Sequence, residues 1–209
     1  MKKENESYTA IVLAAGSGKR MQTKVHKQYL DLLGKPVLYY ALKAFEDSAV
    51  DEIILVTGKG EISYCQTEIV DRYGFEKVTH IVEGGKERYH SVYEGLKCAA
   101  GADYVLIHDG ARPFINEQIL QSVMESVQEN GACVTGVPVK DTIKIADGEG
   151  YAVETPDRNY VWAVQTPQAF SCGLITDAYT KLMATEDLTV TDDAMVLEKM
   201  TGKKVKLVP

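Results

Sequence analysis

The most informative part of the chain is Thr9-Ala10-Ile11-Val12-Leu13-Ala14-Ala15-Gly16-Ser17-Gly18-Lys19-Arg20-Met21. It begins with a short apolar, β-branched run, which is typical of a buried strand. Small residues follow directly, and they allow backbone N–H groups to approach an anion closely. This part of the chain therefore predicts a strand that ends in an anion-binding turn.

Two common phosphate-binding motifs do not fit this turn. A P-loop needs glycine at position 13 and serine or threonine at position 20, where the chain has Leu13 and Arg20. The dinucleotide-binding motif needs a third glycine where Met21 stands. A polyphosphate site of another kind remains, in which Arg20 and Lys27 neutralise charge. The alternative is a tight turn followed by solvated lysines.

The charge of the chain is unevenly distributed. It has 209 residues, with 23 Lys and Arg against 30 Asp and Glu and a net charge of −7. So acidic a chain is a poor candidate for binding nucleic acid. From Ser7 to Leu30, however, there is no acidic residue, while Lys19, Arg20, Lys24 and Lys27 all lie in this window. The local excess of positive charge favours a phosphate ligand.

Cysteine spacing and hydropathy bear on the compartment. The four cysteines are widely spaced and form no Cys-x-x-Cys pair, which predicts reduced thiols. The sequence has no signal-peptide core and no apolar run long enough to span a membrane. We therefore expect a cytoplasmic protein with no membrane partner.

Outward from the first turn, strand-like and helix-like segments alternate. The β-branched runs are 9–13, 52–56, 79–82, 104–108, 133–137 and 162–165, and the segments with helical periodicity are 37–45, 61–73, 89–99, 117–129 and 174–183. This order predicts a Rossmann-like α/β fold, with a mostly parallel sheet and helices on both faces. We expect one domain over 1–209, with ligands beyond the carboxyl ends of the strands.

One segment breaks this alternation. Residues 141–155 form two alternating runs around Asp147-Gly148, which is a strong signal for a hairpin turn. We expect an inserted β-hairpin that projects from the body as an arm over 139–158.

A second candidate for chemistry follows the run 104–108. Asp109 comes at the carboxyl end of the expected strand, and Arg112 lies three residues further on. A carboxylate beside a bound polyphosphate is favourable chiefly when a hard cation lies between them. Asp109 is therefore our candidate metal ligand. The alternative is an aspartate that caps the next turn, paired to Arg112.

Weaker signals lie elsewhere along the chain. Gly84-Gly85 precedes an expected helix, an arrangement that suits a loop over a base or ribose, although such glycine pairs are often simple turns. Thr191-Asp192-Asp193 is typical of a helix N-terminus. Thr142, Arg158 and Thr166 are polar residues around the hairpin and the run after it, and each is individually more typical of a structural role.

The sequence shows no machinery for covalent catalysis. The four histidines do not pair at metal-binding spacing and there is no Gly-x-Ser-x-Gly motif. This fits a reaction whose nucleophile is already an anion. When a phosphate oxygen attacks the α-phosphorus of a nucleotide, the protein supplies positioning and charge neutralisation.

Five groups of residues match one known family in order along the chain. They are Ala14-Ala15-Gly16-Ser17-Gly18-Lys19-Arg20-Met21 with Lys27-Gln28-Tyr29, His108-Asp109-Gly110-Ala111-Arg112-Pro113-Phe114, Asp141-Thr142-Ile143-Lys144, Asp157-Arg158-Asn159 and Gln165-Thr166-Pro167-Gln168. Together they resemble the 2-C-methyl-D-erythritol 4-phosphate cytidylyltransferase family. The resemblance implies a fold of the nucleotide-diphospho-sugar transferase type.

The resemblance also implies a reaction. CTP and methylerythritol phosphate would be joined with release of pyrophosphate, in the non-mevalonate route to isoprenoids. Arg20 and Lys27 would be catalytic, and Asp109 would lie near Mg²⁺. The nucleotide would be bound by Ala14, Ala15, Gly16, Gly18, Gly85, Ser91, Asp109 and Gly110. The second substrate would be bound by Arg112, Thr142, Arg158, Thr166 and Thr191.

Two further implications concern assembly and differences from the family pattern. The family forms homodimers in which the arm reaches the neighbour, so Thr142 and Arg158 would act in the partner's site. The family also continues beyond Pro209, into a segment in which a lysine contacts substrate phosphate, so either the sequence is truncated or that lysine is absent. His26 stands where the family often has proline, and Gly110 where it often has alanine.

Two other functions stay open. A cytidylyltransferase for ribitol 5-phosphate or another polyol phosphate shares the first turn and Arg-Pro-Phe, although that family tends to have Ala-Gly-Gly at 14–16. A non-catalytic nucleotide-binding or regulatory protein could keep the fold without the chemistry. Pyrophosphate release with each polyol phosphate distinguishes these possibilities.

Overall fold

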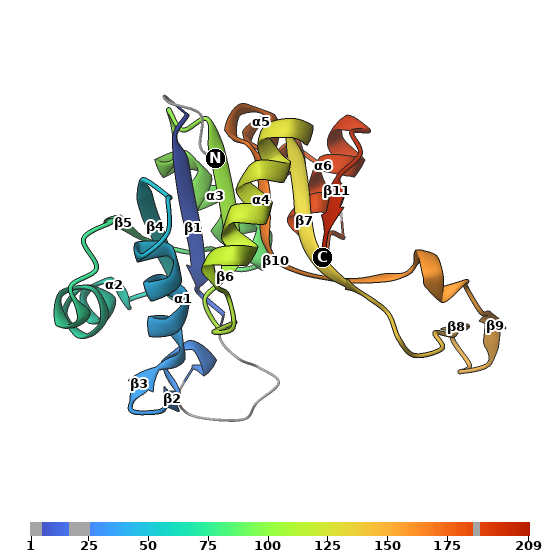
Figure 1. Ribbon diagram of the computed structural model, residues 1–209, viewed down its shortest axis with the longest axis horizontal. Helices are drawn as coiled ribbons and strands as arrows, with labels where there is room; N and C mark the ends of the chain where they lie inside the picture. The colour runs from blue at the N-terminus through green and yellow to red at the C-terminus, as the bar shows by residue number, and fades with distance from the viewer. Residues whose placement is uncertain (1–5, 17–25, 186–188) are drawn as a thin grey trace.

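The computed structural model describes residues 6–16, 26–185 and 189–209. Seven strands form one sheet in the order β11-β7-β10-β6-β1-β4-β5 (Figure 1). Their bounds are β1 Tyr8–Ala14, β4 Glu52–Thr57, β5 Val78–Glu83, β6 Tyr104–Asp109, β7 Ala132–Pro138, β10 Trp162–Ser171 and β11 Lys206–Val208. The first apolar run is thus an interior strand, between β6 and β4.

Strand direction follows from the connections. β1 is parallel to β4 and β6, β4 to β5, and β7 to β11, whereas β10 is antiparallel to both β6 and β7. A parallel neighbour needs a crossover connection, usually a helix. Residues 139–161, between β7 and β10, contain no α-helix, and β10 returns beside β7 in the opposite direction.

Helices cover both faces of the sheet. One face packs against α1 (Val37–Glu46) and α4 (Glu117–Asn130), through side chains such as Phe45 and Val123. The other face packs against α3 (Arg88–Cys98), α5 (Cys172–Met183) and α6 (Asp193–Thr201). Successive strand residues point to opposite faces, so Ile11 lies in the second core while its neighbours Ala10 and Val12 lie in the first. The predicted Rossmann-like α/β fold is confirmed.

One expected helix needs correction, and short strands are present that were not expected. The expected helix 61–73 is a short α2 (Ile62–Tyr64) followed by a π-helical segment η2 (Cys65–Asp71), because apolar periodicity does not reveal which hydrogen-bond spacing the backbone adopts. Pro36 precedes α1 as its N-cap and belongs to β3 (Lys35–Pro36). The last strand β11 was not expected, since three residues are too few for a periodic signal.

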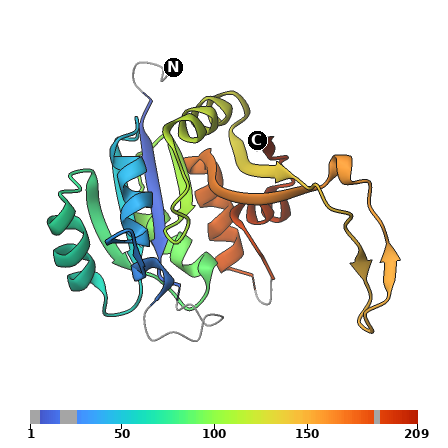
Figure 2. The same cartoon turned by 60° about the horizontal axis from the view of Figure 1, so that its bottom comes forward.

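The segment between β7 and β10 reaches away from the sheet (Figures 1 and 2). It carries β8 (Ile145–Ala146), β9 (Ala152–Glu154) and a 3-10 turn, η3 (Arg158–Tyr160). β8 and β9 pair antiparallel, and the Asp147 carboxylate accepts hydrogen bonds from the backbone N–H groups of Glu149 and Tyr151, at 3.0 and 2.9 Å. Asp147 thus holds the hairpin turn. We call residues 139–158 the arm.

A short connection links the first turn to α1. It consists of the 3-10 turn η1 (Lys27–Tyr29) and the strand pair β2 (Asp31–Leu32) and β3. In the part of the chain that the structure describes, no helix is long and apolar enough to cross a membrane.

Candidate active site

The turns after β1 and β5 touch at the carboxyl edge of the sheet. A Cβ atom on Gly84 would lie 2.6 Å from the Cβ of Ala15 and 2.5 Å from the Ser91 Oγ, so only glycine fits there. The Gly85 N–H donates to the Ser91 Oγ at 3.2 Å, and that hydroxyl donates to the Glu87 carbonyl at 3.3 Å. Ser91 is buried and shapes the turn that carries Gly85.

β6 brings Asp109 to the same edge. Asp109 pairs in register with Leu13 of β1, and the Gly110 N–H donates to the Leu13 carbonyl at 2.8 Å. A Cβ on Gly110 would meet the Leu38 Cδ1 at 2.7 Å. The predicted nucleotide-binding residues that the structure describes therefore lie at one edge of the sheet. Ala14, Ala15, Gly16, Gly85, Asp109 and Gly110 are on strand ends and the turns that follow them, and Ser91 is in the first turns of α3.

Two arginines share the Asp109 carboxylate. The Arg88 Nε lies 3.2 Å from Oδ1, and the Arg112 Nε lies 3.2 Å from Oδ2. Burial alone would raise the pKa of Asp109, but the charges of Arg88 and Arg112 hold it below its ordinary value. The ion pair between Asp109 and Arg112 is the one that the sequence analysis gave as the alternative to a metal ligand. The contact with Arg88 was not expected, and it joins the start of α3 to the end of β6.

Arg88 is held in place by a buried aspartate from the far end of the chain. Its two terminal nitrogens each lie 2.9 Å from one oxygen of Asp193, a bidentate pair. Asp193 is fully buried and also accepts a hydrogen bond from the Tyr179 hydroxyl at 2.5 Å. Burial opposes the charge on Arg88, but attraction by Asp193 and Asp109 outweighs it and raises the pKa of Arg88.

The start of α6 is fixed by Gln168 of β10. The Gln168 Oε1 accepts hydrogen bonds from the N–H groups of Asp193 and Ala194 at 3.1 and 3.0 Å. Asp192 is the N-cap, accepting from the Met195 N–H at 2.9 Å. The helix N-terminus expected at 191–193 thus forms, and the exposed Thr191 lies just before it, with its hydroxyl 3.8 Å from the Met195 sulfur.

A hydrogen-bonded chain links Asp109 to the loop of Arg112. The Thr166 Oγ1 accepts from the Asp109 N–H at 3.2 Å and lies 3.1 Å from the His108 Nδ1. The His108 Nε2 lies 3.1 Å from the Arg112 carbonyl, which requires Nε2 to carry the proton. Burial lowers the pKa of His108 to about 4, so His108 is neutral at physiological pH and Thr166 donates to its Nδ1.

A cavity of about 360 Å³ opens beside His108, Arg112 and Thr166. Arg112 and Thr166, two of the predicted substrate-binding residues, line it together with Phe114, Gly136 and Gln165. Arg112 is half-exposed and Thr166 partly buried. The cavity therefore offers the Arg112 guanidinium to an incoming anionic ligand, while the Thr166 hydroxyl proton is already donated to His108.

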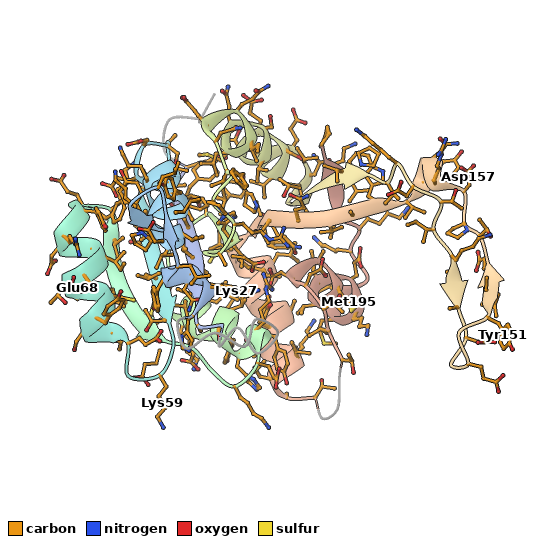
Figure 3. The ribbon with its side chains drawn as sticks, turned by 90° about the horizontal axis from the view of Figure 1, so that it is seen from below. Lys27, Lys59, Glu68, Tyr151, Asp157 and Met195 are labelled. Atoms are coloured by element: carbon orange, nitrogen blue, oxygen red, sulfur yellow. The ribbon has the colours of Figure 1, made fainter. Side chains whose placement is uncertain are left out.

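Lys27 belongs to the short turn η1 and its side chain is exposed. The neighbouring Gln28 is buried and its amide donates to the carbonyl of Ala14, at the end of β1. Figure 3 looks onto the carboxyl edge of the sheet, where Lys27 and Met195 are labelled. Lys27 thus lies at the same edge as the small-residue turn.

The remaining predicted residues are placed differently. Arg20 and Gly18 lie outside the described residues. Thr142 and Arg158 lie on the arm, and the Arg158 guanidinium donates to the Lys140 carbonyl at 2.9 Å. Asp157, the neighbour of Arg158, is labelled on the arm in Figure 3, well away from Lys27. A single chain therefore does not bring Thr142 and Arg158 to Asp109.

Asp109 suits a metal held mainly by a substrate. Among the described residues no three His, Cys, Asp or Glu side chains come together as a ready-made metal cluster. Mg²⁺ characteristically takes one or two carboxylates and completes its shell with water and substrate phosphates. One carboxylate at the edge where the small-residue turns meet fits that mode.

The contacts that tie Arg88 to Asp193, and the start of α6 to Gln168, were not expected from the sequence. Arg88 and Asp193 are 105 positions apart, and no local pattern connects them. The sequence offered one hint that Arg88 belongs to the site. Arg88 lies three residues after Gly85, just as Arg112 lies three residues after Asp109.

Taken together, a mostly parallel sheet, small-residue turns at its carboxyl edge and a carboxylate–arginine cluster define a nucleotide-binding α/β domain. Comparison with known proteins then gives the family. The model of the family described as 2-C-methyl-D-erythritol 4-phosphate cytidylyltransferase matches residues 8–209. The chain belongs to this family.

Individual proteins similar to this chain have the same family name. The 2-C-methyl-D-erythritol 4-phosphate cytidylyltransferase of Lachnoclostridium phytofermentans is 52% identical over 203 residues, which are 97% of this chain and 87% of that protein. The corresponding protein of Lachnospira eligens is 54% identical over 202 residues, 96% of this chain and 88% of that protein. The crystal structure of 4-diphosphocytidyl-2C-methyl-D-erythritol synthase from Anaerococcus prevotii matches with a TM-score of 0.86 and 36% identity, covering 97% of this chain and 86% of that one. The predicted enzyme class, a cytidylyltransferase, is confirmed.

Proposed function

We propose that this chain transfers the cytidylyl group of CTP to 2-C-methyl-D-erythritol 4-phosphate. The products are 4-diphosphocytidyl-2-C-methyl-D-erythritol and pyrophosphate, in non-mevalonate isoprenoid biosynthesis. The observation that carries the proposal is the position of Asp109, between the small-residue turns on one side and the cavity lined by Arg112 and Thr166 on the other. The proposed CTP site and the proposed pocket for the polyol phosphate are therefore both adjacent to the Asp109 carboxylate. All the reactants are water-soluble phosphates, which supports a cytoplasmic location.

The reaction needs no general base from the protein. A phosphate oxygen of the polyol substrate attacks the α-phosphorus of CTP, a new P–O bond forms, and the bond to the β-phosphate breaks. Both electrons of the broken bond leave with pyrophosphate. His108 is neutral, buried and engaged on both ring nitrogens, which supports a structural role for it. Lys27 and Arg20 would neutralise the charge that develops on the phosphates.

The nucleotide would lie along the turns that meet at the sheet edge. Backbone groups of Ala14, Ala15, Gly16, Gly18, Gly85 and Gly110 allow close approach, because these residues have little or no side chain. Ser91 would act by holding the Gly85 turn, since its hydroxyl already bonds to Gly85 and Glu87.

Asp109 would hold Mg²⁺ together with phosphate oxygens of CTP. The ion, when bound, would polarise the phosphoryl oxygens and neutralise charge. Asp109 is held ionised by Arg88 and Arg112. Arg112 is the more exposed of the two, at 46% against 31%, and Arg88 is tied to Asp193. Arg112 is therefore the guanidinium that can turn toward the second substrate's phosphate. Thr166 lines the same cavity, and Thr191 would be a further contact to this substrate.

We further propose a homodimer in which arms are exchanged. The arm exposes Tyr151 and Val153 at 70 and 63%, and Tyr160, just after the arm, is exposed at 85%. Such apolar exposure is typical of a surface that another chain covers. Thr142 and Arg158 would then complete the site of the neighbouring subunit, which explains why they lie far from Asp109 within one chain.

Pyrophosphate release tests the reaction. The full chain with Mg²⁺, CTP and methylerythritol phosphate is expected to release pyrophosphate, and chelation of the metal by EDTA is expected to stop it. Ribitol 5-phosphate in place of methylerythritol phosphate is the control for substrate choice. Faster release with ribitol 5-phosphate would favour the alternative polyol phosphate. No release with either would leave a non-catalytic nucleotide-binding protein.

Subunit mixing tests the shared site. Arg158→Ala is expected to raise the KM for methylerythritol phosphate about tenfold or more, because one charged contact is lost, with little change in the KM for CTP. Arg158→Ala and Lys27→Ala proteins, each weakly active, are expected to regain activity when mixed and allowed to exchange subunits. A chain that sediments as a monomer, or mixtures without gain, would contradict the exchanged arm.

A further inference from the structure

The turn that carries Lys27 contacts the Glu61 carboxylate, which comes from the loop after β4. The Glu61 Oε1 lies 2.8 Å from the His26 Nδ1, and the Glu61 Oε2 accepts a hydrogen bond from the Tyr29 hydroxyl at 2.8 Å. His26 is the residue immediately before Lys27, and Tyr29 is two residues after it. One carboxylate therefore binds the side chains of residues on both sides of Lys27.

Glu61 is itself fixed from its own loop. The Gly58 N–H donates to the Glu61 Oε2 at 3.1 Å, and a Cβ on Gly58 would lie 2.6 Å from the same oxygen. The Glu61 carbonyl accepts from the Cys65 N–H at 2.9 Å, which joins the loop to the helical segment beyond. The carboxylate is largely buried, at 21% side-chain exposure, so solvent competes little for its hydrogen bonds.

The groups that contact the Glu61 carboxylate are protonated, so the carboxylate accepts hydrogen bonds from them. Burial raises the pKa of Tyr29, which keeps its hydroxyl protonated and able to donate. Burial also raises the pKa of Cys65 to about 11, so the thiol 3.1 Å from the Tyr29 hydroxyl is uncharged. The rings of His26 and Tyr29 stack with centroids 6.3 Å apart.

We propose that Glu61 is a positioning residue for Lys27. It touches neither substrate nor reacting atoms, and it acts by fixing His26 and Tyr29 while Gln28 anchors the turn to β1. This proposal rests on the proposed function, in which Lys27 neutralises the transferred phosphates. His26 gives this chain a polar contact on the near side of Lys27 that a proline at that position could not make, because proline has no side-chain donor.

A double-mutant cycle tests the proposal. Glu61→Ala is expected to lower kcat about tenfold, since small misplacement of a catalytic group is costly, with KM for CTP changed less than threefold. In a Lys27→Ala background the same substitution is expected to lower kcat no further, because the two residues act as one unit. Glu68→Ala is the matched control. Glu68 lies on η2, the helical segment after Glu61, where it forms an exposed ion pair with Arg72, and its loss is expected to leave kcat unchanged.

Two conservative variants separate positioning from folding. Glu61→Gln keeps an acceptor and is expected to recover part of kcat, and Tyr29→Phe removes one hydrogen bond but keeps the ring and is expected to lower kcat. Additive losses in the cycle, or an unchanged kcat in both Glu61→Ala and Tyr29→Phe while Lys27→Ala is impaired, would overturn this proposal alone. An unchanged kcat in Lys27→Ala would overturn the role of Lys27 and this proposal with it.

Discussion

Lys27→Ala is expected to lower kcat for pyrophosphate release by about 10²–10³-fold, the usual cost of losing one preorganised donor to a charged transition state. The KM for CTP is expected to change only a few-fold. The reason is that negative charge builds up on the phosphates during transfer, and an interaction that strengthens only there lowers kcat and not binding. Steady-state kinetics at saturating second substrate measure both quantities.

The control for Lys27 is Lys59→Ala. Lys59 is an exposed lysine on the loop after β4, at the same end of the molecule, and it is labelled apart from Lys27 in Figure 3. The two variants remove the same charge from the chain, so a general electrostatic effect on substrate capture would appear in both. Equal losses in kcat/KM for both variants, with kcat preserved, would contradict a transition-state role for Lys27.

Asp193→Ala is expected to destabilise the fold by about 3–5 kcal/mol, because it leaves the guanidinium of Arg88 without its main partner in a buried site. The Tyr179 hydroxyl loses its acceptor in the same step. In urea the unfolding midpoint is expected to fall by about 1–2 M. Denaturation followed by circular dichroism at constant pH measures the change.

The neighbouring residue gives the matched comparison. Asp192→Ala removes the N-cap of the same helix and is expected to cost only about 1 kcal/mol, since Asp192 accepts hydrogen bonds from neutral donors, the Met195 N–H and the Gln168 amide. A similar, small loss for both variants would show that Arg88 is adequately solvated without Asp193, which would contradict the buried ion pair as a major source of stability.

Much of the fold could be predicted because its signals are local. The apolar run at 9–13 and its small-residue turn identify the interior strand β1. The alternation of strand-like runs and amphipathic segments identifies the two helical layers. The direction of β10 is also readable in retrospect, since no helix separates it from β7. The π-helical hydrogen bonding of η2 is not, because amphipathic spacing predicts only a helix.

The candidate site was predictable where glycines and charges mark turns. Gly84 and Gly85, Asp109 and Arg112 follow strand-like runs directly, and strand ends gather at one edge of a parallel sheet. The contacts that orient these residues are long-range. Glu61 reaches the turn of Lys27 across 35 positions of sequence only because β1 and β4 are neighbours, and Asp193 reaches Arg88 only because α3 and α6 cover the same face.

The pairing of Arg88 with Asp193 has a consequence for how this sequence can be recombined with its relatives. One partner begins α3 and the other begins α6, and almost half of the chain lies between them. A hybrid with a single crossover inside that interval inherits the two charges from different parents. Such a hybrid is expected to keep the ion pair only where both parents carry arginine at position 88 and aspartate at position 193.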